Sequence, residues 1–446
     1  MTKRILLGAP IRQKPEILKI FLAHISRLDS GENEISYFFF DDNTDVKSSE
    51  LLFDFCQKNP CVYERIISRD EYVTSETTHI WKDGLVWKVA NLKDKIIEHA
   101  LNEKFDYLFF VDSDLVLDSR LLLHLIAQNK DIVSEVFWTS WEPNHMQLPQ
   151  VWLTGQYEFL KLGREERLAD TEIQARAISF VREFYKPSLI EVGGLGACTL
   201  ISRNALLRGV SFAEIDNLTY WGEDRHFCIR AKCLGLDLWA DSCYPPLHLY
   251  RESDLKKVPS YLNFIKEDRW TNPQLTIAMT VDDDRLVLLN GVIEAMNGLI
   301  ASLIVIDSTT IGIQNALSAM GHEEVAKVTK VAHIGKLLNQ SERDQYWERI
   351  QQIAPDWMLC IGDEQNIQSV WREIYRQFSL SKEYRYIKIN QQTPKLGSLP
   401  GNSFPSNQET FLFRYTPFFN YQWDPNGNAL YPENLAFFPL LTVNLN

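Results

Sequence analysis

The sequence predicts an α/β protein in which a mostly parallel sheet is flanked by helices, followed by a second, smaller α/β domain. Apolar segments rich in Val and aromatic residues alternate with segments of helical periodicity. The longest apolar run, Tyr107–Leu117, is typical of a strand buried on both faces of a parallel sheet. A second series of alternating segments begins near residue 274.

The first series contains six expected strand segments and six expected helices. The strands are residues 4–8, 35–40, 107–117, 131–138, 190–202 and 237–240, and the helices are residues 15–28, 48–57, 85–102, 121–128, 163–185 and 221–234. In an open sheet of this kind, ligands bind beyond the carboxyl ends of the strands.

The second series resembles the first in plan. A strand at 274–281 is followed by a helix at 285–296, a strand at 301–306 and a strand that ends near Asp363-Glu364, and residues 395–407 read as a loop. We expect domains at 1–251 and 274–446, with a linker or bridging helix at 252–273. An internal duplication explains the parallel plan, although any two α/β domains share strand–helix alternation.

Composition and charge exclude several classes of protein. A chain of 446 residues exceeds one hydrophobic core, and 45% hydrophobic with 24% charged residues is ordinary for a globular protein. A net charge of −13 without a basic stripe argues against binding to nucleic acid or an anionic membrane. The apolar runs are too short for a transmembrane segment or a signal peptide, so we expect a cytoplasmic protein.

Seven cysteines are present, an odd number, and none form a Cys-X-X-Cys motif. This pattern favours reduced thiols over disulfides or zinc binding. Cys228, Cys233 and Cys243 lie close in sequence, but their spacing matches no zinc motif.

Asp112 and Asp114 directly follow the strand that begins at Tyr107. On an extended chain, side chains two residues apart point the same way. Two carboxylates held together repel each other unless a cation joins them, and a hard divalent ion with oxygen ligands fits this role. The alternative is a solvated turn, and the apolar run before the acids favours a metal site.

Three further segments carry polar groups beside expected elements. Asp41-Asp42-Asn43 follows a strand and is suited to a nucleobase or ribose, or to an ordinary turn or helix cap. Trp221-Gly222-Glu223-Asp224 opens a helix, where a carboxylate can act as a general base or as a cap. His248 follows two prolines and is either a third metal ligand, in a site suited to manganese, or a structural residue.

These motifs, together with Gly193-Gly194-Leu195-Gly196, stand in an order that resembles glycosyltransferase family 2 and its GT-A fold relatives over residues 3–250. The resemblance implies a Rossmann-like GT-A domain. It also implies a base contact for Asp42, a metal held by Asp112, Asp114 and His248, and a catalytic base at Asp224 with Glu223 beside it. The nucleotide-sugar contacts that it implies are Pro10, Asp41, Asp42, Asn91, Asp112, Ser113, Gly194 and Trp221.

The sequence departs from that family at two places. The usual Gly-Ser after the first acids is absent, and the Arg that precedes the equivalent of Asn91 in many relatives is missing. Trp138 and Trp141 are not a general family feature, and either can line a sugar cleft or belong to the core.

The resemblance implies a metal-dependent enzyme of the hexosyltransferase type, with an inverting outcome; in the alternative, a retaining enzyme, the same acids would support the donor and the acceptor. It would use Mn²⁺ or Mg²⁺ and a UDP- or GDP-linked sugar, with a glycan, a peptide or a small molecule as acceptor. Two alternatives stay open: a non-catalytic carbohydrate- or nucleotide-sugar-binding protein, and a sugar-1-phosphate nucleotidyltransferase. The second would need a Gly-rich N-terminal loop, whereas residues 8–14 contain one Gly and two cations.

The second domain resembles a degenerate copy of the first. Asp307-Ser308-Thr309 stands where the nucleotide loop would be, and Gly362-Asp363-Glu364 stands in place of the paired acids. Phe411–Arg414 resembles a segment of some family members but lacks the following His-Glu. We expect a non-catalytic domain for acceptor binding or for homo-oligomer formation, with a second active transferase as the alternative.

Overall fold

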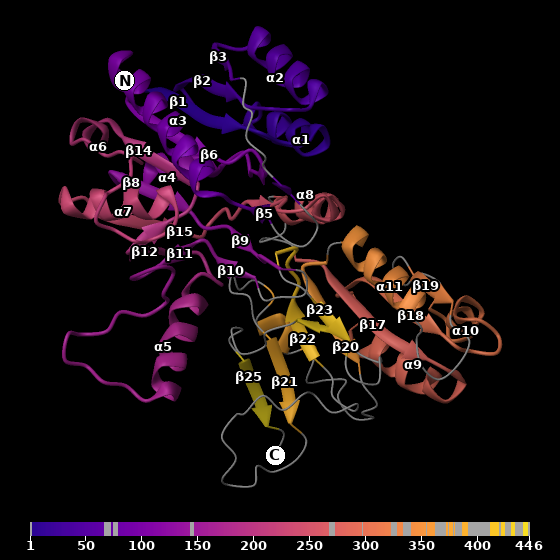
Figure 1. Ribbon diagram of the computed structural model, residues 1–446. Helices are drawn as coiled ribbons and strands as arrows, with labels where there is room; N and C mark the ends of the chain where they lie inside the picture. Colours follow the sequence, from indigo (N-terminus) through magenta and orange to yellow (C-terminus); the bar gives the residue numbers. More distant parts are fainter. Residues whose placement is uncertain are drawn as a thin grey trace. The chain divides into compact units, whose positions relative to one another are not determined.

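The structure is a computed structural model, and it describes residues 2–66, 73–74, 79–142, 147–266, 273–296, 298–322, 328–332, 340–353, 355–361, 372, 374–377, 379, 386–390, 411–418, 421–423, 430–432 and 440–444. The chain forms two compact units, Met1–Val258 and Pro259–Asn446. Each unit contains its own sheet (Figure 1).

The elements of the first unit alternate along the chain much as predicted. Its strands are β1 (Arg4–Ile11), β2 (Glu34–Asp41), β3 (Cys61–Arg65), β4 (Val73–Thr74), β5 (His79–Ile80), β6 (Tyr107–Val111), β7 (Leu115–Val116), β8 (Ile132–Glu135), β9 (Trp138–Thr139), β10 (Leu148–Pro149), β11 (Val151–Trp152), β12 (Leu189–Val192), β13 (Gly194–Leu195), β14 (Cys198–Ser202), β15 (Leu238–Asp241) and β16 (Leu247–His248). Its helices are α1 (Pro15–Ile25), α2 (Val46–Lys58), α3 (Asp83–Asn102), α4 (Leu121–Ala127), α5 (Asp170–Glu183), α6 (Arg203–Leu207), α7 (Glu223–Cys233) and the 3₁₀ helix η1 (Glu252–Lys257).

The main sheet of the first unit has eight strands in the order β12-β15-β8-β14-β6-β1-β2-β3. Strands β6, β1, β2 and β3 are parallel neighbours, as are β8 and β15, while β14 runs antiparallel between β6 and β8. The predicted α/β class with a mostly parallel sheet flanked by helices is therefore confirmed. The carboxyl ends of β1, β2 and β6 lie at the same edge.

Helices cover both faces of this sheet because its strands are apolar on both sides. On one face, alternate residues of β1 pack with Leu18 and Phe21 of α1 and with Leu52 of α2. On the other face, α3 lies close against β1: a Cβ atom at Gly8 would stand 2.5 Å from the side chain of Ile96. Glycine at position 8 therefore sets how closely α3 approaches the strand.

The second unit is built from a comparable set of elements. They are α8 (Val258–Phe264), β17 (Leu275–Val281), the 3₁₀ helix η3 (Asp283–Arg285), α9 (Leu286–Ala295), β18 (Ile300–Asp307), α10 (Ile313–Ala319), β19 (Val328–Ala332), α11 (Gln340–Ile353), β20 (Trp357–Ile361), β21 (Tyr386–Asn390), β22 (Phe411–Arg414), β23 (Tyr421–Trp423), β24 (Leu430–Pro432) and β25 (Leu440–Asn444). The expected linker region, 252–273, contains η1 and α8.

The seven-stranded sheet of the second unit repeats the topology of the first. Its order is β19-β18-β17-β20-β22-β21-β25, which matches β3-β2-β1-β6-β14-β8-β15 strand for strand along the chain. The directions of the six pairings also match: parallel on both sides of the first strand, antiparallel around β22 and β14, and parallel at the far pair. The first unit adds β12 at its edge.

Individual hydrogen bonds repeat with the topology. Asp106 accepts a bond from the backbone N–H of Arg4 at 2.9 Å, and Asp356 accepts one from Gln274 at 2.6 Å. Because these acids stand directly before β6 and β20, each ties the start of its strand to the start of the neighbouring first strand. A shared strand order with the same side-chain contact supports an internal duplication.

Three features differ from the expected elements. The run from Tyr107 is broken by a turn between β6 and β7, and the helix expected from residue 163 begins at Asp170. The segment 190–202 forms β12, β13 and β14, because β13 pairs with β11 outside the main sheet. The predictions for Gly362-Asp363-Glu364 and for the 395–407 loop lie outside the described residues.

Cys56 and Cys61 form a disulfide between the end of α2 and the start of β3. The expectation of reduced thiols is therefore wrong for this pair. The helix returns directly into the strand, which brings the two Cα atoms to 5.0 Å, within the range that a disulfide spans. Cys198, Cys228, Cys233, Cys243 and Cys360 are not in disulfides.

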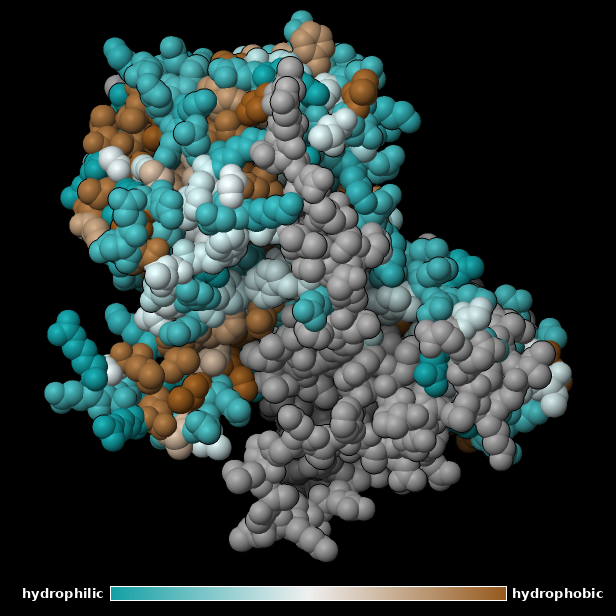
Figure 2. Space-filling model, viewed as in Figure 1, coloured by the Kyte–Doolittle hydropathy of each residue, from teal (hydrophilic) through white to brown (hydrophobic). Residues whose placement is uncertain are grey.

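No helix in the described part of the chain is both long enough and apolar enough to cross a membrane. The face drawn in Figure 2 shows apolar residues in separate patches among polar ones. Isolated apolar residues of this kind are usual on protein surfaces.

Candidate functional site

A cleft of about 560 Å³ opens at the carboxyl ends of β1, β2 and β6. Pro10, Asp42, Asp112, Ser113 and Asp114 line it directly after these strands. Trp221, Glu223 and Asp224 line it from the start of α7, and His248 lines it from β16. Residues from distant parts of the sequence thus meet where an α/β sheet binds ligands, and the volume suits a nucleotide-sized ligand.

Asp112 and Asp114 occupy a tight turn in which the N–H of Leu115 donates to the carbonyl of Asp112 at 3.2 Å. The expected extended geometry is therefore wrong, because the chain turns between β6 of the main sheet and β7 of a separate two-stranded sheet. Asp112 is exposed within the cleft, whereas Asp114 is largely covered. The two carboxylates lie on a turn at one edge of the sheet.

His248 lies beside Asp114 because β16 pairs antiparallel with β7, which places His248 opposite Leu115. Its Nε2 is 3.4 Å from Oδ2 of Asp114, and its Nδ1 is 2.8 Å from the hydroxyl of Thr139. A partner on Nδ1 fixes the orientation of the ring and directs Nε2 toward the acid, as is common for metal-binding histidines.

Asp114 and His248 converge, but Asp112 does not close a compact triad with them. Among the described residues, one group of His, Cys, Asp and Glu side chains has all its ligand atoms within 4.8 Å of one another. That group is His124, Asp241 and Cys243, which do not line the cleft. Mg²⁺ and related ions are commonly held by one or two carboxylates together with substrate phosphates rather than by a complete protein cage. The donors at this edge fit that arrangement.

Glu223 and Asp224 share one buried cation, Lys93 of α3. The Nζ of Lys93 donates to Oε1 of Glu223 at 2.8 Å and to Oδ1 of Asp224 at 2.9 Å, and it lies 4.7 Å from the ring centre of Phe212. Lys93 is only 3% exposed, so this ion pair is shielded from water. Lys93 was not predicted from the sequence, because a lysine on an amphipathic helix normally faces solvent.

Around Lys93, carboxylates outnumber cations. Burial alone would lower the pKa of Lys93, but Asp224, Glu223 and Asp112 raise it overall, so the lysine stays protonated. Desolvation within the cleft raises the pKa of Asp112, and Asp114, Asp224 and Glu223 add to this effect while Lys93 opposes it. Burial and Asp224 raise the pKa of Glu223 in the same way. An excess of carboxylates over cations favours an added cation here.

The two acids after β2 have separate surroundings. Asp41 is fully buried beneath the cleft and accepts hydrogen bonds from Tyr63 at 2.5 Å, from the backbone of Asn43 at 3.0 Å, and from Arg65. Burial would raise its pKa, but these bonds lower it overall. Asp41 does not line the cleft, so the predicted nucleotide contact is corrected to a structural role.

Asp42 faces the cleft with two cations beside it. Its Oδ2 accepts a bond from Lys88 at 2.7 Å and lies 3.8 Å from Arg12. Its Oδ1 is buried and receives no hydrogen bond within the described part of the chain. An oxygen held in this way is available to a ligand donor, consistent with the predicted contact to a base or a ribose.

Two other predicted site residues do not line the cleft. Asn91 is exposed on α3, because a step of two residues turns a helix by about 200° away from Lys93. Gly194 lies in β13, where a Cβ atom would come within 1.9 Å of the ring of Trp152. Gly194 therefore acts indirectly, by letting Trp152 pack against β13 at the wall of the cleft.

Aromatic side chains form much of the remaining wall. Trp221 is 44% exposed, and Trp141, Trp152 and Tyr157 line the same cleft. Trp138 instead packs edge-on against Tyr185 in the core. Of the two tryptophans, Trp141 therefore lines the cleft and Trp138 belongs to the core.

Residues 2–141 match the family model for the N-terminal domain of glycosyltransferase family 25. A Drosophila melanogaster glycosyltransferase 25 family member is 22% identical over 129 residues, which cover 28% of this chain and 21% of that protein. The resemblance of the first unit to glycosyltransferases is confirmed over this region. The match includes Asp42 and Asp112–Asp114 and ends before Glu223, Asp224 and His248.

Solved structures of glycosyltransferases are also similar to this chain. They include Staphylococcus aureus TarS 1–349 at 14% identity and a TM-score of 0.33, covering 59% of this chain and 65% of that one. A Pyrobaculum calidifontis mannosyltransferase in complex with GDP-Man and Mn²⁺ is 10% identical with a TM-score of 0.35, covering 59% and 62%. GalNAc-T7 with UDP, GalNAc and Mn²⁺ is 12% identical with a TM-score of 0.36, covering 55% and 44%.

Proposed function

We propose that the first unit is a metal-dependent glycosyltransferase that moves a sugar from a UDP- or GDP-linked donor to a hydroxyl group. The observation that carries the proposal is the cleft, where Asp42, the Asp112–Asp114 turn and the Glu223–Asp224 pair meet at the carboxyl ends of parallel strands. The family match over residues 2–141 supports the same class of reaction.

Asp114 and His248 would hold Mn²⁺ or Mg²⁺, with Asp112 on the other side of the turn. Such an ion would neutralise the negative charge that develops on the diphosphate as its bond to the sugar breaks. Arg12 lies at the same edge and lines the cleft, where its guanidinium suits a phosphate oxygen. Asp42 would accept a hydrogen bond from the nucleoside through its buried Oδ1.

Asp224 is the candidate general base. It lines the cleft in the first turn of α7, and Lys93 binds its Oδ1, which leaves the second oxygen to accept the proton of an acceptor hydroxyl. Glu223 shares Lys93 but is more deeply buried, which suits it to positioning. In this inverting scheme the acceptor oxygen attacks the anomeric carbon while the diphosphate leaves from the opposite side. Trp221 and the other exposed rings offer apolar faces for a sugar acceptor, whether glycan, peptide-linked or small.

We also propose that the second unit is a non-catalytic copy that serves acceptor binding or self-association. The repeated topology supports common origin, and Ser308 and Gly362 in place of Asp42 and Asp112 in the sequence support the loss of chemistry.

The proposal is tested by Asp224→Asn after a thermal-shift screen of UDP- and GDP-sugars, with and without Mn²⁺, has identified the donor. Turnover should fall at least ~10²-fold, the usual scale for loss of a general base, while nucleotide affinity stays within a few-fold. Asp216→Asn, an exposed position outside the cleft, is the matched control and should behave as wild type. Wild-type turnover in Asp224→Asn would move the base elsewhere, and donor consumption that releases pyrophosphate from a nucleoside triphosphate would favour the nucleotidyltransferase.

A further inference from the structure

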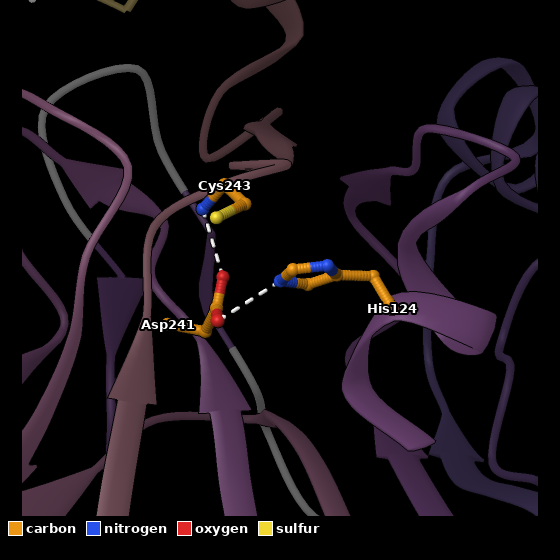
Figure 3. A group of neighbouring side chains, drawn as sticks. All are labelled: His124, Asp241 and Cys243. Atoms are coloured by element: carbon orange, nitrogen blue, oxygen red, sulfur yellow. Dashed lines mark hydrogen bonds and ion pairs between the residues drawn. The ribbon is translucent and has the colours of Figure 1, made fainter. Parts of the chain in front are cut away.

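A second group of polar side chains gathers away from the cleft, at the carboxyl ends of β8 and β15. Glu135 and Asp241 are the last residues of these parallel strands and stand directly opposite each other in the sheet. His124 reaches them from α4, and Cys243 follows β15. Figure 3 shows His124 and Cys243 directed toward Asp241 from two sides. None of these residues lines the cleft.

The geometry of this group is compact. Nε2 of His124 lies 3.0 Å from Oδ2 of Asp241, and the N–H of Cys243 donates to Oδ1 of Asp241 at 2.8 Å. The ligand atoms of His124, Asp241 and Cys243 all lie within 4.8 Å of one another. The amide of Gln128 is also near, with its nitrogen 3.1 Å from the same Nε2.

Glu135 supplies an independent observation. Its side chain is fully buried; Oε1 accepts a bond from the N–H of Tyr244 at 2.7 Å, but Oε2 receives none from a donor within the described residues. The side chain instead interacts with the carboxylate of Asp241. Two buried carboxylates can approach in this way only if a proton or a cation lies between them.

The other charges nearby have defined partners. Arg120 donates to both oxygens of Asp118, at 2.9 and 2.5 Å, and its guanidinium stacks 4.9 Å from the ring centre of Tyr244. The carboxylate of Asp241 lies against the imidazole of His124 and close to the thiol of Cys243, and Glu135 stands beside Asp241. An imidazole, a thiol and carboxylates form the mixed ligand set that zinc prefers, whereas Mn²⁺ and Mg²⁺ prefer oxygen ligands.

We propose that His124, Asp241 and Cys243, with Glu135 beside Asp241, form a binding site for a zinc-like divalent cation, separate from the candidate nucleotide site. The ion would join α4 to the ends of β8 and β15. It would also anchor the segment after Asp241, which leads through Cys243 to His248 in the cleft. Its role is structural, and it fixes the approach of that segment.

The spacing of Cys243 from Cys228 and Cys233 predicts no zinc site. The structure places Cys228 on α7, where it accepts a bond from the N–H of Leu195, and Cys233 is exposed. The partners of Cys243 come from three separate elements, so no local spacing motif reveals them.

The test uses the full chain carrying Asp114→Ala, which removes the candidate nucleotide metal site and leaves only the second cluster. After treatment with a chelator, the protein is titrated with Co²⁺, and absorption from a thiolate–cobalt bond is followed. One equivalent of Co²⁺ with this absorption is expected, and Zn²⁺ should displace it. In the same background Cys243→Ser should lose the thiolate band, and His124→Gln should bind Co²⁺ at least ~10-fold more weakly, by analogy with the loss of supporting groups at metal sites.

The matched control is Cys233→Ser, which changes an exposed cysteine outside the cluster and should retain both the band and the stoichiometry. A thiolate band that persists in Cys243→Ser would overturn the proposal. So would the absence of Co²⁺ and Zn²⁺ binding before substitution, which would mean that a shared proton joins Glu135 and Asp241. If Cys243→Ser fails to fold, the affinity of His124→Gln alone decides, because an unchanged value contradicts the proposed ligand set.

Discussion

The two units share a scaffold but differ in the residues that follow its strands. Asp42 donates its N–H to the carbonyl of Ile11 at 2.9 Å, and Ser308 donates to Val281 at 2.8 Å in the same place of the second sheet. The residues before them also agree, since Asp41 and Asp307 each accept a bond from the N–H two positions later, at 3.0 and 2.9 Å. The second unit therefore keeps the structural acid and has serine where the first has the cleft-facing acid.

The same comparison extends to the paired acids. Ile5 stands opposite Tyr107 and Leu275 stands opposite Trp357, so the two sheets share a register. Asp112 follows Tyr107 by as many residues as Gly362 follows Trp357, so these two positions correspond in the sequence. Backbone pairing and buried side chains are thus retained where the residues that would bind a ligand are changed. Fold and chemistry separate within one chain, since function resides in side chains placed on a scaffold.

The largest expected effect tests whether the acids of the first unit bind a metal–nucleotide complex. In Asp114→Ala, the Mn²⁺-dependent part of UDP or GDP binding should fall by about 10²-fold or more, because a bound metal contributes several kcal/mol to holding a diphosphate. Isothermal titration calorimetry with Mn²⁺ and with EDTA measures this part. Equally tight binding by wild type and Asp114→Ala in Mn²⁺, or wild-type binding that is as tight in EDTA as in Mn²⁺, would contradict the metal site.

Lys93 is the next test, since no described lysine of the second unit is paired with two acids in this way. In Lys93→Met, the buried Glu223 loses its cation, so the free energy of unfolding should fall by about 3 kcal/mol, the low end for breaking a buried ion pair. Urea unfolding measures the change. The control is Lys95→Met on the exposed side of the same helix, expected within about 0.5 kcal/mol of wild type.

The elements of both units could be predicted from sequence because hydrophobic periodicity is local. Strands β1 and β2 and helix α3 agree with expectation to within a few residues. The turn at Asp112–Asp114 could not be predicted this way, since the apolar run continues through β7. After the turn, β7 leaves the main sheet and pairs with β16, more than a hundred residues later in the chain.

The acids of the site were found because they follow apolar strands, and His248 because two prolines precede it. Lys93 and Trp152 were missed for a physical reason. Each reaches the cleft through tertiary contacts, Lys93 through burial against Phe212 and Trp152 through close packing on Gly194. Neither contact can be inferred from a sequence pattern. Asn91 was predicted on the helix that does line the cleft, α3, but its side chain lies on the face of α3 that is turned away from the cleft.

Asp41 allows a test of the structural acid that the two units share. Its folded-state pKa is lowered, so its ionised form stabilises the fold above the unfolded value, near pH 4, and this contribution is lost as the pH falls through the folded value. Asp41→Asn should lower the free energy of unfolding at neutral pH by about 2 kcal/mol, the scale of a hydrogen bond to a charged group. The difference from wild type should shrink below about pH 4. Asp54→Asn, exposed on α2, should show neither effect, and an equal loss at every pH would mean that Asp41 acts through packing alone.

The smallest expected effect concerns the acids of the second unit. In the sequence, Gly362 stands where the first unit has Asp112, and Glu364 stands where it has Asp114. Because Gly362 and Ser308 replace the equivalents of Asp112 and Asp42, we expect no second nucleotide site. Asp363→Ala with Glu364→Ala should therefore leave donor turnover unchanged within about two-fold, the range typical of surface substitutions below 0.5 kcal/mol. Titration with a non-hydrolysable donor should give one nucleotide per chain in both proteins. Two nucleotides per chain, with the second lost in the double variant, would show that the second unit binds its own donor.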